Sequence, residues 1–279
     1  MRSSIFIAGS LFVMAASAPA ATIYGVDENN NLISFNSSAP GSMLSSIAIT
    51  GLDNSIGALD FRPINNVLYG LGSDRVIYTI NTMSGVATAA SGVLALNGTS
   101  FAFDFNPSID RLRIVSDAND NYVFNPNDGA LTNATSVFYA PGDANAGANP
   151  DVTAAAYTSA MFGGTTQLYS IDTALDGLAK QANSVGTLTS VGPLGVNLGS
   201  RTSFDIAGSE AYAFNGSTLY GVNLTTGALT ALGNTDRALF GIAISPAAVP
   251  EPASWALMIT GFALVGTTMR RRRMALAFA

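Results

Sequence analysis

The sequence predicts an all-β fold, a β-propeller of five four-stranded blades closed by joining the N- and C-terminal strands, with one transmembrane helix at the C-terminus. Three observations favour it: a recurring hairpin with a glycine turn, a short apolar strand before each hairpin, and an incomplete unit at each end of the body. Four strands in about 40–50 residues are typical of a propeller blade. A β-sandwich or an open β-solenoid is the alternative architecture.

The hairpin joins an aromatic or aliphatic strand to a Thr-rich strand through a polar turn. Its clearest copies are VIYTINTMSGVAT (76–88), YVFNPNDGALT (122–132) and TLYGVNLTTGALT (218–230), and weaker copies are LAKQANSVGTLT (178–189) and LISFNSSAPGSML (32–44). The turn glycines are expected at Gly41, Gly85, Gly129, Gly186 and Gly227, because tight hairpin turns need positive φ.

A second repeat precedes the hairpins and is predicted to be the buried strand of each blade. Its copies are ALDFRP (58–63), AFDFNP (102–107), AAAYTS (154–159), SFDIAG (203–208) and GIAISP (241–246). The first unit begins at Ile23 without this strand, and the last copy has no blade after it. Joining the two ends completes a fifth blade and removes an exposed sheet edge.

On ALDFRP, LYGLGSDRVIYTINTMSG and YAPGDANAGANPDVTAAAY, the body resembles a family of domains of unknown function found in secreted bacterial proteins. The resemblance covers most of residues 23–246. It supports one domain at residues 21–246 and implies no activity and no catalytic residues.

Residues 1–20 are predicted to be a signal peptide. Arg2 precedes an apolar run at residues 5–16, and the small residues Ala18 and Ala20 frame the expected cleavage point after Ala20. A buried N-terminal helix is the alternative. The sequence therefore indicates export, with signal peptidase as a transient partner.

The C-terminal segment has three parts: a linker at residues 247–252, an apolar stretch at 253–269 and a basic tail at 270–279. Seventeen helical residues span roughly 25 Å, near the lower limit for a transmembrane helix. Arginines stay on the cytoplasmic side, so the body is expected outside. The sorting residues are Pro250, Glu251, Pro252, Arg270, Arg271, Arg272 and Arg273.

VPEPASWALMITGFALVGTTMRRRR resembles the PEP-CTERM sorting domain of bacterial surface and secreted proteins. The resemblance implies that an exosortase in the membrane recognises the segment, cuts near the Pro-Glu-Pro motif and passes the body to the cell surface or matrix. An ordinary anchor that is never cut is the alternative.

Composition restricts the chemistry. The chain has no cysteine and no histidine, which excludes thiol nucleophiles, thiolate or imidazole metal sites and a Ser-His-Asp triad. Five of the 12 basic residues lie in the signal peptide and the basic tail, so residues 21–252 keep seven basic residues against all 18 acidic residues and carry a net charge of about −11. Nucleic acid and anionic lipid are therefore poor partners.

The interval before Gly186 is the longest, and the excess falls at residues 140–151, APGDANAGANPD. Loops on a rigid scaffold often carry function. Asp143, Asn145, Asn149 and Asp151 offer oxygen ligands suited to calcium or to sugar hydroxyls. A solvated loop built on Asx turns is the alternative, and no cofactor other than calcium is expected.

Asp60, Asp104 and Asp205 occupy the same point of three buried strands, and Ala156 and Ala243 occupy it in the other two. Three carboxylates near a propeller axis could bind a cation or act as acid and base on a glycosidic bond. Buried carboxylates need partners, and accepting backbone N–H bonds is their ordinary structural role.

The leading hypothesis is a non-enzymatic surface or matrix protein that binds polysaccharide or a surface protein. The alternative is a carboxylate-dependent glycoside hydrolase or lyase that uses Asp60, Asp104 and Asp205. A passive spacer is a third interpretation.

Overall fold

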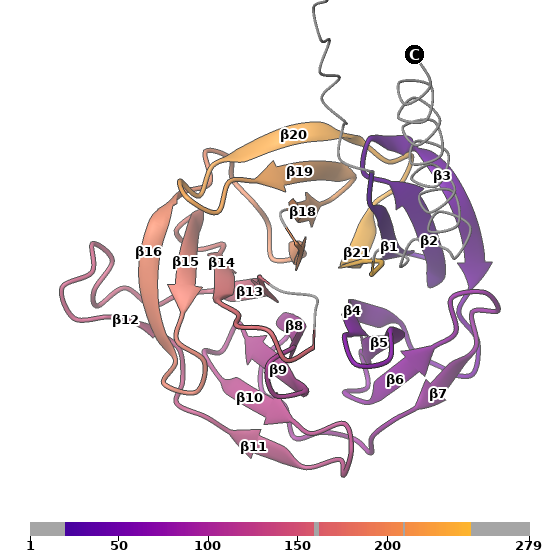
Figure 1. Cartoon of the computed structure of the whole chain (residues 1–279), viewed down its shortest axis with the longest axis horizontal. Helices are drawn as coiled ribbons and strands as arrows, with labels where there is room; N and C mark the ends of the chain where they lie inside the picture. Colours follow the sequence, from indigo (N-terminus) through magenta and orange to yellow (C-terminus); the bar gives the residue numbers. More distant parts are fainter. Residues whose placement is uncertain (1–19, 159–161, 209, 247–279) are drawn as a thin grey trace, which may run out of the picture.

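The computed structural model describes residues 20–158, 162–208 and 210–246. Five small sheets form a ring around a central axis (Figure 1), and each sheet is one blade of a β-propeller. The predicted β-propeller and its five blades are therefore confirmed.

The blades are numbered here from the first complete unit along the chain, and each starts at the strand nearest the axis. The first holds β4 (Ile56–Arg62), β5 (Val67–Gly72), β6 (Ile77–Ile80) and β7 (Ala87–Ala89). The second holds β8 (Phe101–Asn106), β9 (Arg111–Ser116), β10 (Asn121–Phe124) and β11 (Leu131–Asn133). The third holds β13 (Val152–Tyr157), β14 (Leu168–Asp172), β15 (Gly177–Gln181) and β16 (Thr187–Pro193). The fourth holds β17 (Ser203–Ala207), β18 (Glu210–Asn215), β19 (Thr218–Val222) and β20 (Leu229–Asn234).

The fifth blade contains strands from both ends of the domain. It consists of β21 (Leu239–Ile244), β1 (Thr22–Asp27), β2 (Asn31–Asn36) and β3 (Ala39–Ala48). Ile23 of β1 pairs with Ile244 of β21 in an antiparallel register. This pairing closes the ring without leaving an inner strand unpaired, as the two incomplete sequence units predict.

The third blade has an additional outer strand. β12 (Phe138–Tyr139) runs parallel to β16 on its outer edge, and residues 140–151 then return the chain to the axis. The predicted insertion therefore lies between the outer edge of the third blade and its inner strand β13.

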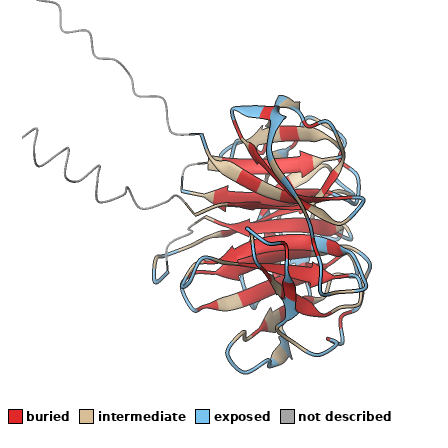
Figure 2. Cartoon of the chain, turned by 90° about the vertical axis from the view of Figure 1, so that its right-hand side faces the viewer, coloured by how far each residue is buried: buried red, intermediate tan, exposed pale blue. Residues whose placement is uncertain are grey.

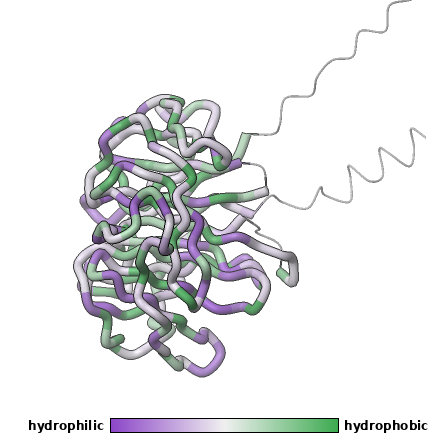
Figure 3. The backbone as a smooth tube through the Cα atoms, turned by 90° about the vertical axis from the view of Figure 1, so that its left-hand side faces the viewer, coloured by the Kyte–Doolittle hydropathy of each residue, from purple (hydrophilic) through white to green (hydrophobic). Residues whose placement is uncertain are grey.

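The core lies between neighbouring blades and around the axis. The inner strands β4, β8, β13, β17 and β21 contact one another in that order around the ring. Their apolar side chains pack against the second and third strands of adjacent blades, and buried residues run through the middle of the stack of strands (Figure 2). Hydrophobic and hydrophilic segments alternate over short distances along the backbone (Figure 3), as expected of short strands joined by polar turns.

Four of the five expected turn glycines have positive φ, between 73° and 84°: Gly85, Gly129, Gly186 and Gly227. The expectation for Gly41 was wrong. Gly41 lies inside β3, because the hairpin between β2 and β3 closes at Ser37 and Ser38, two residues that need no glycine. At Gly85 a side chain would also collide with the carbonyl oxygen of Ala48 in the fifth blade.

Within the described residues, no helix is long and apolar enough to cross a membrane. The expected transmembrane helix at 253–269 lies outside those residues.

Candidate functional site

Three carboxylates meet at the propeller axis. Asp60, Asp104 and Asp205 lie on the inner strands β4, β8 and β17 and are 5–7% exposed. One carboxylate oxygen from each residue lies within 4.8 Å of the other two. Within the described ranges, this is the one group of three or more acidic residues with such spacing. The structure thus brings together the three aspartates that the sequence repeat singled out.

Each carboxylate accepts a backbone hydrogen bond from the inner strand of the next blade. The donor is always the residue directly after the equivalent ring position of that blade. The pairs are Phe105 N to Asp60 Oδ2 at 2.6 Å, Tyr157 N to Asp104 Oδ1 at 3.1 Å, and Ile244 N to Asp205 Oδ2 at 2.5 Å. The aspartates therefore link β4 to β8, β8 to β13, and β17 to β21 at the level of the axis.

The two alanines at this level explain the remaining contacts. The side chains of Ala156 and Ala243 cannot accept a hydrogen bond from the following blade. In each following blade, the amide after the ring position therefore donates to the aspartate of its own strand. Ile206 N donates to Asp205 Oδ1 at 2.6 Å, and the Phe61 amide contributes in the same way to Asp60. Three carboxylates thus serve five backbone amides, which is a structural role.

Burial raises the pKa of all three acids. For Asp60 and Asp104, burial together with repulsion from neighbouring carboxylates raises the pKa well above its ordinary value. Burial also raises the pKa of Asp205, to about 6, and the amides of Ile244 and Ile206 limit the increase by hydrogen bonding to the ionised form. All three acids therefore keep their protons to a higher pH than an exposed aspartate does.

The space beside the three carboxylates is small. They line a cavity of about 20 Å³ together with Tyr157 and Pro246. A volume of about 20 Å³ holds roughly one water molecule. A sugar ring therefore does not fit against these acids in this conformation.

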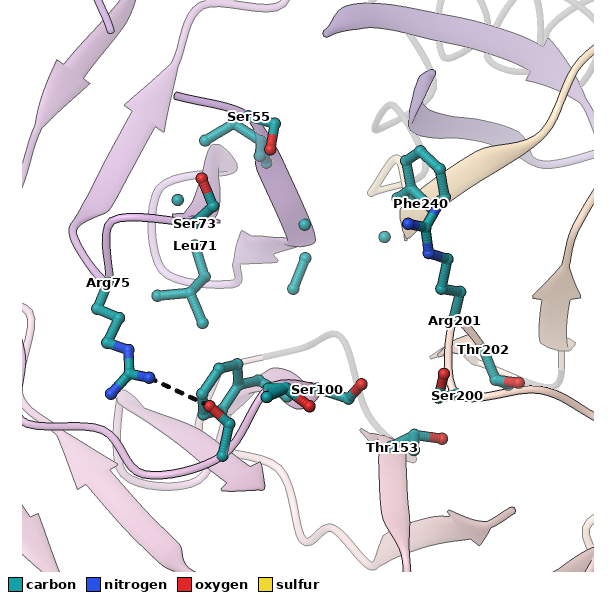
Figure 4. A pocket seen from close by; sticks show the side chains of 18 of the residues that line it. Ser55, Leu71, Ser73, Arg75, Ser100, Thr153, Ser200, Arg201, Thr202 and Phe240 are labelled. Atoms are coloured by element: carbon teal, nitrogen blue, oxygen red, sulfur yellow. Dashed lines mark hydrogen bonds between the residues drawn. The ribbon is translucent and has the colours of Figure 1, made fainter. Parts of the chain in front are cut away.

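A much larger opening lies where the inner strands begin. We call it the funnel; its volume is about 670 Å³ (Figure 4). Every blade contributes to its wall the residue three positions before the ring position of the aspartates. These five residues are Gly57, Phe101, Thr153, Thr202 and Phe240. The funnel and the aspartate cluster thus involve opposite parts of the same five strands.

The funnel wall combines three kinds of group. Hydroxyls come from Ser55, Ser73, Thr99, Ser100, Thr153, Ser200 and Thr202, and phenyl rings come from Phe101 and Phe240. Two guanidinium groups, of Arg75 and Arg201, face the opening from opposite sides (Figure 4). The Arg201 guanidinium lies 4.7 Å from the centre of the Phe240 ring. Such a wall can donate hydrogen bonds, stack on an apolar ring face and attract an anion.

The four predicted ligand residues of the insertion form hydrogen bonds with residues of the second and third blades. Asp143 accepts hydrogen bonds from the amide and hydroxyl of Ser190 in β16 at 2.7 and 2.6 Å, and Asn145 donates to the same hydroxyl at 2.9 Å. The Ser190 hydroxyl is the main cause that lowers the pKa of Asp143. The other two contacts are Asn119 Nδ2 to Asn149 Oδ1 at 2.7 Å and Thr173 Oγ1 to Asp151 Oδ2 at 3.0 Å. These side chains anchor the loop to three parts of the second and third blades.

The remaining predicted residues belong to the termini. Ala20 is the first described residue and is exposed. The others lie outside the described residues: Ala18, Pro250, Glu251, Pro252, Arg270, Arg271, Arg272 and Arg273.

The funnel was not among the sites predicted from the sequence. In the buried-strand repeat, only the aspartate position gave a predicted site. The same alignment, followed three residues toward the N-terminus, gives the five wall residues, including Phe101 and Phe240. Arg75 could not be found in this way because it lies in the turn between β5 and β6.

A family model described as "Domain of unknown function (DUF4394)" matches residues 31–243, which is most of the chain. The match begins at the start of β2 and ends within β21, so it covers four blades in full and the fifth without β1. No curated protein matches the sequence.

Proposed function

Because the chain belongs to the DUF4394 family, for which no function is known, we propose a function from its geometry: a non-enzymatic, exported surface or matrix protein whose funnel binds polysaccharide. The single observation that carries this proposal is the funnel itself. Its volume of about 670 Å³ lies within the range of ordinary ligand sites.

The lining of the funnel suits a sugar chain. Hydroxyl groups on the wall can exchange hydrogen bonds with sugar hydroxyls. The Phe101 and Phe240 rings, both half-buried, offer apolar faces for the C–H face of a pyranose. The funnel opens at the axis, where Phe101, Thr153 and Phe240 are held on the inner strands β8, β13 and β21.

The arrangement of the acids argues against catalysis. A glycosidase needs two carboxyl groups on either side of the scissile bond, with room for the sugar between them. Asp60, Asp104 and Asp205 are buried beside a cavity of about 20 Å³ and are occupied by backbone amides. Their close spacing and raised pKa values are the features that keep a glycoside hydrolase or lyase as the second candidate.

Export is supported by the two terminal segments of the sequence. The signal peptide directs the chain to signal peptidase, and the PEP-CTERM-like tail directs it to an exosortase. The tail holds the protein in the membrane before processing, after which the propeller is released to the surface or matrix, where polysaccharide is abundant. A surface protein is the other partner class for the same funnel.

The test uses the full-length chain, purified in a sugar-free detergent, and the extracellular polysaccharide of the producing strain. Co-sedimentation and released reducing ends are both measured, with calcium and with chelator. We expect binding without sugar release. Phe240→Ala should weaken binding at least fivefold, whereas Phe138→Ala, a matched change at a 41% exposed ring on the outer strand β12, should not.

Other outcomes change the proposal. Sugar release that Asp104→Asn abolishes would establish the hydrolase or lyase. Binding that disappears with chelator and with Asp143→Ala would move the site to the insertion. Absence of any binding would refute the polysaccharide proposal.

A further inference from the structure

Resting on the proposed polysaccharide function, we propose that the funnel selects an acidic glycan, with Arg75 and Arg201 binding the carboxylates of uronic acid units. A carboxylate accepts two parallel hydrogen bonds from one guanidinium, a geometry that neither lysine nor a hydroxyl offers.

The Arg201 guanidinium is available for an anion. Arg201 is exposed, and its guanidinium is held 4.7 Å from the centre of the Phe240 ring. Within the described part of the chain, neither Arg201 nor Arg75 has a carboxylate within 4.0 Å. Stacking against a ring fixes the plane of the guanidinium and leaves its N–H edge free to meet a carboxylate.

Arg75 occupies an unusual backbone position. Its φ is 64°, in the left-handed region that residues other than Gly, Asn and Asp seldom adopt. The equivalent turn between the second and third strands has a positive φ in every blade. The other blades place there Asn30, Asn119, Asp176 and Gly216.

The first blade therefore carries an arginine where its four counterparts use residues that tolerate this conformation. Strain kept at one copy of a repeat, at the rim of a cavity, indicates that the side chain has a function. One nitrogen of Arg75, Nη2, donates to the carbonyl oxygen of Gly98 at 3.2 Å, which orients the guanidinium across the rim (Figure 4).

The acidic residues near the funnel do not neutralise the positive charges of Arg75 and Arg201. Asp27 is bonded to Arg237 at 3.1 Å and to the amides of Asn29 and Asn31, so its carboxylate is already neutralised. Glu28 is exposed to solvent at the rim. The rest of the body is strongly acidic. The two arginines without a carboxylate partner therefore make the funnel a positively charged site that attracts an anionic polymer.

A third observation points to a ligand in the funnel. Thr153 lines the wall and is 2% exposed, and its hydroxyl has no hydrogen-bond partner in the residues that the structure describes. A buried hydroxyl without a partner is costly for a protein to keep. A sugar hydroxyl in the funnel would give Thr153 the missing bond when the wall adjusts to the ligand.

The experiment compares one polymer in two charge states. The full-length chain in sugar-free detergent is titrated calorimetrically with a galacturonic acid hexamer and with the same hexamer fully methyl-esterified. We expect the ester to bind at least tenfold more weakly. Binding of the acid should weaken as sodium chloride rises, because the guanidinium–carboxylate pairs are partly exposed.

Two arginine variants locate the site. Arg201→Gln should weaken acid binding at least tenfold. Arg111→Gln, the same change in β9 beside the last residue of β8, should alter it less than twofold, because Arg111 lies away from the funnel. Arg75→Asn should weaken binding while it raises the midpoint of thermal unfolding, because asparagine relieves the strained φ. A merely structural arginine would not give this opposite pair of effects.

The outcomes separate this inference from the proposed function. Equal binding of acid and ester, with loss in Phe240→Ala, would overturn the acidic-glycan inference and keep a neutral-sugar site. Acid binding that Arg75→Asn and Arg201→Gln leave unchanged would also overturn it. Binding of an acidic peptide but of no hexamer or strain polysaccharide would refute both proposals.

Discussion

Replacing Asp104 with asparagine should make the protein more stable at neutral pH. The asparagine oxygen can still accept the Tyr157 amide, and its uncharged NH₂ group replaces one carboxylate oxygen beside Asp60 and Asp205. Two full charges 4.8 Å apart repel by roughly 3 kcal/mol at an effective dielectric constant of about 20. Asparagine avoids both this repulsion and the cost of taking up the proton that would keep Asp104 neutral, so the free energy of unfolding should rise by about 1–3 kcal/mol at neutral pH.

The pH dependence follows from the direction of the pKa shifts. Burial raises the pKa of Asp205 from 3.8 to about 6, so the folded protein holds more protons than the unfolded chain between these values. The stability from this group is fully present below about pH 4 and is lost as pH rises through about 6. That rise in pKa corresponds to roughly 3 kcal/mol. The wild type should therefore become less stable toward neutral pH.

The assay is urea unfolding followed by circular dichroism at about pH 4 and pH 7, for the wild type, Asp104→Asn and Asp104→Ala. Asp104→Asn should change stability by less than about 1 kcal/mol at the lower pH, where the acids are largely protonated. Asp104→Ala should cost about 1–3 kcal/mol there, because the buried Tyr157 amide loses its acceptor. If Asp104→Asn is no more stable than the wild type at neutral pH and keeps its pH slope, the repulsion argument is refuted.

Three further predictions test other parts of the molecule. Gly85→Ala should destabilise by more than the roughly 1–2 kcal/mol expected for Gly129→Ala, because both have positive φ but only Gly85 lies against a neighbouring blade; equal losses in urea unfolding would contradict this. Arg62→Met should cost about 3–5 kcal/mol, because it leaves the buried Asp110 carboxylate without its ion pair; a loss below about 1 kcal/mol would show that the pair is dispensable. Replacing residues 250–252 by alanine should leave the protein in the membrane fraction of the producing strain, as measured by fractionation and blotting, and normal release would argue against exosortase processing.

Much of the fold could be predicted because the blades repeat. Short apolar strands and glycine turns recur at nearly constant intervals, and each turn glycine with positive φ reports a local backbone requirement that sequence alone can indicate. The prediction for Gly41 was wrong because a two-residue turn at Ser37 and Ser38 closes this hairpin without glycine. Alignment of the repeat also placed Asp60, Asp104 and Asp205 at one level, because equivalent residues of a closed ring must face the same axis.

The all-β class, the five blades, the closure by both termini and the meeting of three aspartates could be predicted before the structure, since each depends on local periodicity or on the symmetry of a repeat. The surroundings of those residues could not be predicted in this way. The tertiary structure bonds the three acids to backbone amides beside a cavity of about 20 Å³, and it opens the funnel of about 670 Å³ between Arg75 and Arg201. These features arise where different blades meet, and the distance between side chains of different blades is set by ring packing rather than by the order of residues along the chain.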